Sequence, residues 1–243
     1  MLFALPLAGL VWRVPWSSAW EELTSRAALD ALRLSMVTSL AATVICLVVG
    51  VPLAWVQARV PYPGKRFVRA LTTLPMVLPP VVGGVALLLA LGRRGLVGRE
   101  LDRIGVNLPF TTAGAIVAEA FVAMPFLVLT LEAAFRSADR RLEEAARTLG
   151  ARRFTVFRRV TLPLVAPSLV AGTVLCWARA LGEFGATITF AGNLQGTTQT
   201  IPLFVFVKLE GSNPDSAIVL SLVLVVVSLG VLVGLRDRWL TAR

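Results

Sequence analysis

Long apolar runs, separated by short charged segments, constrain the fold of this chain most strongly. The clearest run covers about residues 32–55, and others cover about residues 70–91, 111–134, 163–179 and 217–235. About twenty consecutive apolar residues are enough for a helix that crosses the hydrocarbon core of a bilayer. The chain is 56% hydrophobic over 243 residues, which is too apolar for a soluble domain, and it has no linker that would separate a second domain. We therefore predict an all-α membrane protein with a single transmembrane domain over residues 1–243.

The N-terminal apolar run is shorter than the others. Residues 1–12 are too few for a span, and they lack the charged start and the cleavage site of a signal peptide. We interpret them as the outer part of a first transmembrane helix, with an interfacial anchor as the alternative. Three tryptophans near this run suit the outer interface, where indole rings settle: Trp12, Trp16 and Trp20. The prediction is thus six transmembrane helices with both termini in the cytoplasm.

The positive charges predict this orientation. Residues 57–69 carry four basic and no acidic residues, and residues 136–159 carry eight arginines against three acidic residues. The tail adds Arg236, Arg238 and Arg243 against one aspartate. Loops rich in Lys and Arg stay in the cytoplasm, although residues 93–110, predicted to be outside, carry a net +2 against this tendency. Because the charges are divided among short loops, they form no continuous face for nucleic acid.

The third predicted span contains residues that interrupt a helix: Pro75, Pro79, Pro80, Gly83 and Gly84. Proline removes a backbone hydrogen bond and kinks a helix. At membrane depth such a break is tolerated only where protein or a wet cavity covers the freed carbonyls. We expect this segment to line a translocation pathway, and a packing kink with close glycine contacts is the alternative.

Charged residues inside the predicted spans are few. Glu119 lies in the fourth span and should face protein or water, because a carboxylate is costly in lipid. Arg179 lies deep in the fifth span. It can form a structural ion pair with Glu183 at i+4 or with Glu119, or it can attract an anion directly. We favour the ion pair and hypothesise that Arg179 and Glu183 hold a gate.

The sequence contains no catalytic pattern. It has no histidine, no Cys-x-x-Cys pair and no Gly-x-x-x-x-Gly-Lys-Ser/Thr loop for nucleotide phosphates. Cys46 and Cys176 lie in apolar spans and are interpreted as free packing residues. We therefore expect no enzymatic activity, no metal and no cofactor. A self-contained proton-driven carrier, with Glu119 and Glu183 as titrating groups, remains an alternative.

A polar stretch at residues 137–163 lies between two apolar runs. Ser137 or Asp139 can cap a helix that ends at Gly150, and Leu142 and Leu149 then share one face. A second short helix should follow, with the next span starting near Pro163. By pattern alone, this stretch can also be an amphipathic loop on anionic lipid.

The order Glu144-Ala145-Ala146, Gly150, then Val160-x-Leu162-Pro163 resembles the EAA loop of ABC importer permeases. The one departure is Val160, where that family usually has isoleucine. The resemblance implies a cytoplasmic coupling helix that docks on a separate ATPase subunit. The implied coupling residues are Glu143, Glu144, Ala145, Ala146, Leu149, Gly150, Leu162 and Pro163.

Further stretches resemble the molybdate permeases of the sulfate, molybdate and tungstate branch. They are residues 74–84, 92–96, 179–187, 190–193 and 200–203, and the similar core covers about residues 31–236. This implies the type I ABC importer fold in the cell membrane, as a homodimer with two ATPase subunits and an extracytoplasmic oxyanion-binding protein. Tungstate, sulfate and thiosulfate are the alternative substrates.

In that branch the third and fifth spans line the route. A tetrahedral dianion needs hydrogen-bond donors and mild positive potential rather than a tight site. The residues implied for the pathway or gate are Pro79, Pro80, Gly83, Gly84, Arg179, Gly182, Glu183, Phe184, Gly185 and Thr187.

Overall fold

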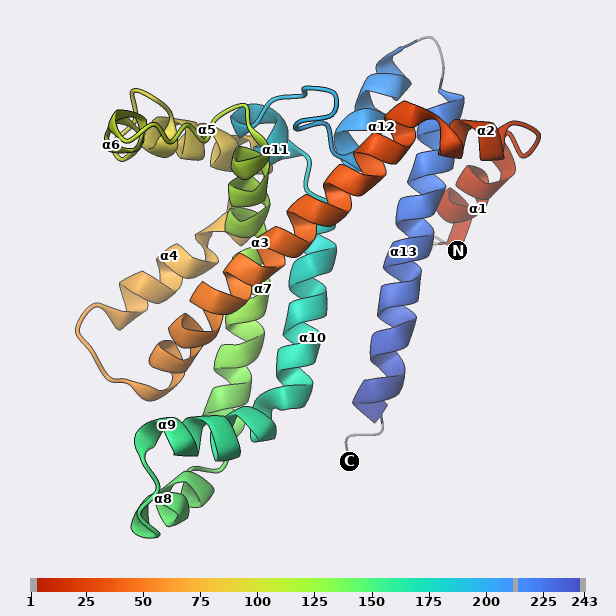
Figure 1. Ribbon diagram of the computed structural model, residues 1–243. Helices are drawn as coiled ribbons and strands as arrows, with labels where there is room; N and C mark the ends of the chain where they lie inside the picture. Colours follow the sequence, from red (N-terminus) through yellow and green to blue (C-terminus); the bar gives the residue numbers. More distant parts are fainter. Residues whose placement is uncertain (1–3, 212–213, 241–243) are drawn as a thin grey trace.

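The structure, a computed structural model, describes residues 4–211 and 214–240. All regular elements in this part of the chain are helical (Figure 1). The first seven are α1 (Ala4–Arg13), α2 (Ala19–Thr24), α3 (Arg26–Arg59), α4 (Lys65–Val77), α5 (Pro80–Leu91), α6 (Gly98–Arg103) and α7 (Thr112–Ser137). The others are α8 (Arg140–Thr148), α9 (Arg153–Val156), the π-helical turn η1 (Phe157–Thr161), α10 (Leu162–Leu181), α11 (Gly185–Phe190), α12 (Ile201–Glu210) and α13 (Asp215–Leu240).

Helix α3 is the longest element and crosses α7 and α10 at a steep tilt (Figure 1). Its 34 residues correspond to roughly 51 Å, which exceeds the ~30 Å hydrocarbon core and requires such a tilt. Small residues occupy the packed side of α3, and a side chain at Gly50 would be tightly packed, since its Cβ position lies 3.3 Å from atoms of both Leu127 and Val128. Close approach through small residues is the usual way for helices to pack in a membrane.

The core lies between α3, α7 and α10. Leu127, Leu131 and Phe135 of α7 are fully buried there, against alanines and Cys46 of α3 and Cys176 of α10. Among the described residues, three helical segments are long and apolar enough to span a membrane, namely α3, α7 and the continuous stretch Arg153–Leu181. These contain the predicted second, fourth and fifth spans. Helix α5 and residues 215–230 of α13 are apolar but shorter.

The third predicted span is two helices. Helix α4 ends at Val77 and α5 begins at Pro80, and in Figure 1 the two run in clearly different directions. Leu78 and Pro79 between them are extended, with ψ of 136° and 132°. A residue before proline is driven out of the helical region, and here two such residues stand in succession. Pro75, by contrast, lies inside α4.

Helix α10 starts at Leu162, next to the predicted start of the fifth span at Pro163, but helical structure begins before it. The helix runs on from Arg153 through α9, η1 and α10 without interruption. Pro163 has no amide hydrogen for the carbonyl of Arg159, and the π-helical turn just before it accommodates this loss, with the Leu162 amide donating to the Phe157 carbonyl.

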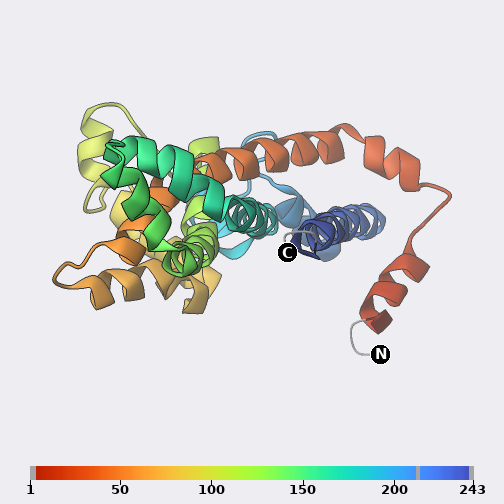
Figure 2. The ribbon, with the colours of Figure 1, turned by 90° about the horizontal axis from the view of Figure 1, so that it is seen from below.

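The two ends of the chain pack together on one side. Helix α1, of ten residues, lies beside α13 and away from α4 and α8 (Figures 1 and 2). The Ser216 hydroxyl of α13 hydrogen-bonds the Glu22 carboxylate of α2. The three predicted interfacial tryptophans are all exposed: Trp12, Trp16 and Trp20. Residues 1–3 and the side chains of the basic tail, Arg236, Arg238 and Arg243, lie outside the described part.

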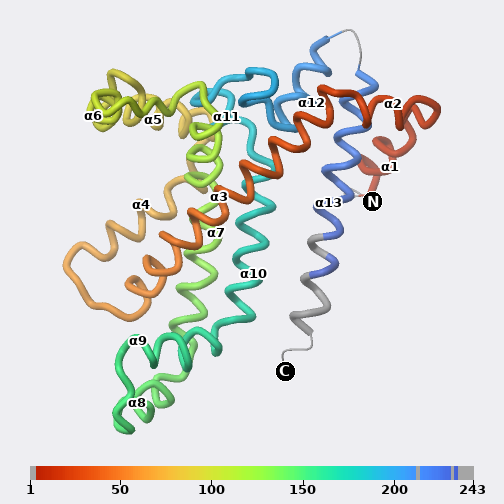
Figure 3. The backbone as a smooth tube through the Cα atoms, viewed as in Figure 1, coloured from red at the N-terminus to blue at the C-terminus, as the bar shows by residue number. Residues whose placement is uncertain are grey.

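Helix α12 was not among the predicted elements. It follows α11 after an irregular loop, which Figure 3 traces between the two. Pro202 stands in its first turn, and the Ile201 amide donates to Ser35 Oγ of α3 at 2.7 Å. Ile201 and Phe204 are buried against Leu220 of α13, so this short helix fills the space between α3 and α13.

Candidate functional site

Helix α8 lies at one extreme end of the molecule, beyond the tips of the long helices (Figure 1). Of the two predicted caps, Asp139 is the one used, and its carboxylate accepts from the Arg141 amide at 2.9 Å. The helix stops at Gly150, whose φ of +86° is the left-handed conformation that glycine adopts readily. The Ala151 amide then donates to the Ala146 carbonyl at 3.0 Å, which completes the cap.

Glu143 anchors α8 to the rest of the protein. Its carboxylate lies 2.9 Å from Arg59 Nη2 and accepts from the Thr161 hydroxyl at 3.1 Å. The two charged side chains are 7% and 9% exposed. Arg59 ends α3 and Thr161 ends η1, so one carboxylate joins three elements. Glu143, one of the expected coupling residues, is thus buried within this chain, where its contacts hold α8 in place.

Several of the other expected coupling residues lie at α8 and its C-terminal end. Glu144 and Ala145 are exposed, Ala146 is half-buried, and the Leu149 side chain is 88% exposed. We call the exposed set Leu142, Glu144, Ala145, Leu149 and Phe154 the α8 patch. Large apolar side chains exposed together mark a contact surface for another molecule. Leu162 and Pro163 lie apart from it, in the first turn of α10.

The second group of expected residues meets where α5 contacts α11. The Cβ position of Gly84 lies 2.6 Å from Thr189 Cβ, and that of Gly185 lies 2.7 Å from Pro80 Cβ. Real Cβ atoms do not approach so closely, so both glycines are required by this contact. Gly83 faces the Phe121 ring of α7 in a less close contact, with its Cβ position at 3.2 Å. The break that the prolines cause therefore places α5 directly on α11.

Glu183 holds the junction between α10 and α11. Its carboxylate lies 2.6 Å from Arg179 Nη2 and also accepts from the Ala186 amide at 2.8 Å, in the first turn of α11. Its side chain is 1% exposed, whereas that of Arg179 is 27% exposed. Glu119 is elsewhere and accepts from the Thr38 hydroxyl at 2.8 Å. Of the three alternatives for Arg179, the structure shows the ion pair with Glu183.

The remaining expected residues surround this junction. Gly182 is exposed, and Thr187 is fully buried with no hydrogen-bond partner for its hydroxyl among the described residues. The Phe184 ring packs against Phe206 of α12, with 4.9 Å between centroids. Sequence reasoning missed Phe206 together with helix α12, and the apolar run after Pro202 is the signal that could have indicated this helix. Within residues 4–211 and 214–240 no three metal-ligating side chains gather.

Comparison with known proteins gives this arrangement a family. The sequence profile of the binding-protein-dependent transport system inner membrane component matches residues 47–243. The chain belongs to this family. It is accordingly a multi-pass membrane component of a transport system and not an enzyme.

Relatives of this transport permease are similar over nearly their whole length. The molybdenum transport system permease protein ModB of Mycobacterium tuberculosis is 49% identical over 235 residues, 97% of this chain and 89% of the relative. ModB of Escherichia coli K12 is 42% identical, with 87% and 92% covered. The sulfate transport system permease protein CysT of Salmonella typhimurium is 34% identical, with 94% and 84% covered.

Solved structures show the same fold. The permease resembles a chain of a bacterial ABC transporter that imports the acidic polysaccharide alginate, with a TM-score of 0.74 and 21% identity, covering 99% of this chain and 90% of that one. The alginate transporter in complex with a pentasaccharide-bound periplasmic protein gives a TM-score of 0.70 at 19% identity, with 96% and 92% covered. The fold is therefore that of an ABC transporter permease.

Proposed function

We propose that this chain is the permease subunit of an ATP-driven importer that carries molybdate into the cytoplasm. The observation that carries the proposal is the 49% identity, over 97% of the chain, to a protein named as a molybdenum transport permease. A sulfate permease is also related, at 34% identity, so sulfate is the second candidate substrate. Tungstate, which has the same tetrahedral form, falls within the first proposal.

The proposed architecture is a single domain of six membrane-spanning segments in a type I importer fold. Helices α3, α7 and the segment ending in α10 supply three spans, α4 with α5 and α13 supply two, and α1 contributes to the first. Both termini and α8 would lie in the cytoplasm, as the basic residues 57–69 and 136–159 favour. A second copy of the chain would complete the pathway.

The α8 patch is the proposed docking surface for an ATPase subunit. Two features of this surface support the assignment. Leu149 and Phe154 expose apolar area at the end of the molecule, and Glu144 places one carboxylate beside the small Ala145. A short, small-residue helix can seat closely in a groove, and its buried ion pair with Arg59 keeps it rigid when force is applied.

The contact of α5 with α11 is the proposed gate. The ion pair of Arg179 with Glu183 fixes the start of α11, and the half-exposed guanidinium still adds positive potential for a dianion. Thr187 and the amides near Gly182 and Gly185 are the proposed additional donors. Because Glu183 neutralises most of the arginine charge, binding in the route stays weak enough for release.

Uptake measurements test the proposal. Cells that depend on this chain should accumulate molybdate, and an excess of tungstate should compete more strongly than an equal excess of sulfate. Sulfate competing as well as tungstate would favour the second substrate. Glu144→Arg should abolish co-purification with the ATPase subunit, while Glu21→Arg, an exposed acid at the opposite end of the molecule, should not. Unchanged co-purification of Glu144→Arg would exclude the α8 patch as the docking surface.

A further inference from the structure

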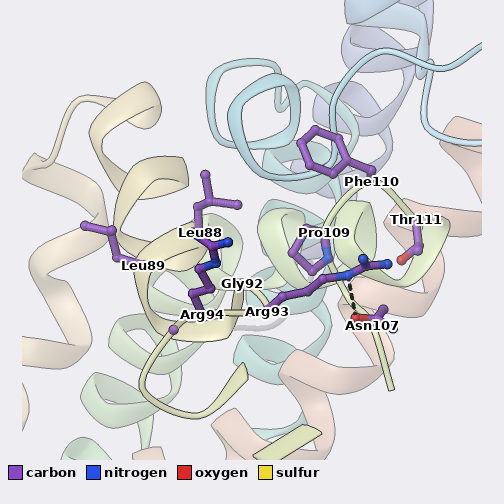
Figure 4. A pocket seen from close by; sticks show the side chains of 10 residues that line it. Leu88, Leu89, Gly92, Arg93, Arg94, Asn107, Pro109, Phe110 and Thr111 are labelled. Carbon is purple, nitrogen blue, oxygen red and sulfur yellow. Dashed lines mark hydrogen bonds between the residues drawn. The ribbon is translucent and has the colours of Figure 1, made fainter. Parts of the chain in front are cut away.

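A cavity of about 730 Å³ lies at the end of α5, at the opposite end of the molecule from α8 (Figures 1 and 4). We call it the outer pocket. It lies between the last turn of α5 and the segment that leads into α7, and Leu88, Arg93, Arg94, Asn107, Phe110 and Thr111 are among the residues that line it. Neither the proposed gate nor the α8 patch includes this cavity.

The charged groups of the outer pocket are all positive. Arg93 and Arg94 are exposed, and no acidic side chain lines the cavity. Arg93 reaches across it and donates from Nε to Asn107 Oδ1 at 3.1 Å, as Figure 4 shows. Within the described residues, neither arginine is paired with a carboxylate; Glu100 of the same loop is already bound by Arg103 at 2.6 Å. The pocket thus offers two unneutralised guanidinium groups.

These arginines lie where the charge rule disfavours them. Residues 93–110 carry four arginines against two acidic residues, and in the proposed orientation they face the outside. Excess Lys and Arg in a short loop favours the cytoplasmic side, so this loop opposes the topology that the rest of the chain favours. Arginines that oppose the favoured topology are explained if they bind a negatively charged partner outside the membrane.

Phe110 adds backbone strain at the same place. Its φ is 60°, and it is the one non-glycine residue in the described part of the chain with a positive φ. Such conformations in bulky residues cluster at functional sites. The Phe110 amide donates to the Phe190 carbonyl at 3.3 Å, and its ring lies 2.9 Å from the Cβ position of Gly192. One wall of the pocket is therefore attached to the end of α11.

The lining of the pocket also includes exposed apolar side chains. Leu89 of α5 and Phe110 both line the cavity and are 68% and 57% exposed. Such apolar side chains offer no hydrogen-bond donors to a free oxyanion. Arginine and an aromatic ring surrounded by aliphatic groups are instead the composition of an anchoring region in a protein–protein interface.

We propose that the outer pocket receives an acidic side chain of the extracytoplasmic binding protein, held between Arg93 and Arg94. This rests on the proposed function, which requires such a protein. Guanidinium groups bind carboxylates through paired, charge-assisted hydrogen bonds, and Asn107 keeps one of them oriented. Since the pocket is built from the end of α5 and is attached to α11, docking there acts on both helices of the gate.

The test measures binding of the purified binding protein to the permease–ATPase complex in nanodiscs. Charge reversal in the double variant Arg93→Glu/Arg94→Glu should weaken this binding by about ten-fold or more and should remove most of its dependence on salt. Arg99→Glu is the matched control, because Arg99 is an exposed arginine of the same loop that does not line the pocket. It should change the affinity by less than about two-fold.

Assembly with the ATPase and basal ATP hydrolysis are measured on the same samples, which shows that each variant is folded. The inference is overturned if the double variant binds as the wild type does, or if Arg99→Glu is equally impaired. It is also overturned if the wild-type complex without binding protein retains molybdate and the double variant loses that retention, since the pocket would then hold the free oxyanion. Failure of the proposed function would appear differently, as absence of molybdate uptake by the wild-type complex.

Discussion

Replacing Glu143 by alanine should detach α8 from the body of the permease. The Arg59 guanidinium is almost fully buried, and its Nε and Nη1 atoms have no hydrogen-bond partner. Glu143 is therefore the group that neutralises it, through a contact of 2.9 Å. Without the carboxylate, Arg59 would remain as an uncompensated buried charge, and the Thr161 hydroxyl would lose its acceptor.

The size of the effect follows from this geometry. Removing one partner of a buried ion pair costs about 3–5 kcal/mol, because the remaining charge stays desolvated. Arg147, at 3.8 Å from Glu143 and half exposed, is too distant and too well solvated to change this value much. For a chain of 243 residues, each kcal/mol corresponds to roughly 2–4 °C in apparent Tm, so a decrease of about 10 °C is expected.

A thiol-reactive fluorophore measures this loss directly in detergent-solubilised protein. Cys46 and Cys176 are the two cysteines of the chain, and both are fully buried in the core of α3, α7 and α10. They react only when the helices separate, so the dye reports unfolding without an introduced label. Glu144→Ala is the matched control. Its side chain is on the exposed face of the same helix, and its Tm should stay within about 1 °C of the wild type.

A double variant tests whether the loss of stability comes from the unpaired charge of Arg59 or from the loss of packing at Glu143. Arg59→Met/Glu143→Leu removes both charges and keeps apolar volume, so it should recover most of the stability that Glu143→Ala loses. The reasoning is refuted if Glu143→Ala unfolds at the wild-type temperature. It is equally refuted if the double variant is no more stable than the single one, since the cost would then not come from the orphaned arginine.

Two further predictions concern the proposed gate. Gly185→Ala would place a methyl group 2.7 Å from Pro80, so it should lower the free energy of unfolding by about 1–3 kcal/mol and abolish uptake. Gly182→Ala is the control and should be tolerated, because the nearest neighbour of its Cβ position is 3.6 Å away. Similar uptake by the two variants would contradict this prediction. Arg179→Met should reduce both Tm and uptake, because it leaves the buried Glu183 carboxylate without its ion-pair partner. The double variant Arg179→Met/Glu183→Gln should recover the Tm but not the uptake. If transport is unchanged in both Arg179 variants, the ion pair does not hold the gate.

The sequence predicts the long helices well because each has a local cause. Apolar runs indicated α3, α7 and α10, and Asp139 and Gly150 marked the two ends of α8. The features that the sequence did not predict depend on packing. Nothing local shows that the helix continues through Pro163, because the π-helical turn that permits it forms from residues before the proline. Helix α12 is only ten residues long, and its fit between α3 and α13 is not visible in its own sequence.

The sequence indicated which residues belong to the candidate sites, but not which way their side chains point or what they contact. The spacing of Glu143 and Glu144 cannot show which of them faces inward, since that depends on Arg59, 84 residues away in sequence. Likewise Arg179 had two acidic candidates, and only the fold shows that Glu119 instead binds Thr38 of α3. Close contact through the glycines near the prolines was the alternative interpretation of this segment, and their partner, α11, follows only from the tertiary arrangement.

The two expected sites are joined by one helix. Helix α10 begins at η1, where Thr161 is bound to the carboxylate that anchors α8, and it ends at Leu181, two residues before the carboxylate that caps α11. Both junctions use a buried glutamate paired with an arginine, so the helix is fixed at each end by a rigid charged contact rather than by mobile loops. A displacement of α8 by a docked ATPase should therefore move α10 as one unit and shift α11 against α5. Coupling of this kind predicts an effect on transport that is separate from ATPase binding. It requires that Glu143→Ala also slow uptake in complexes that still bind the ATPase, and that Glu144→Ala slow uptake only to the extent that ATPase binding is lost.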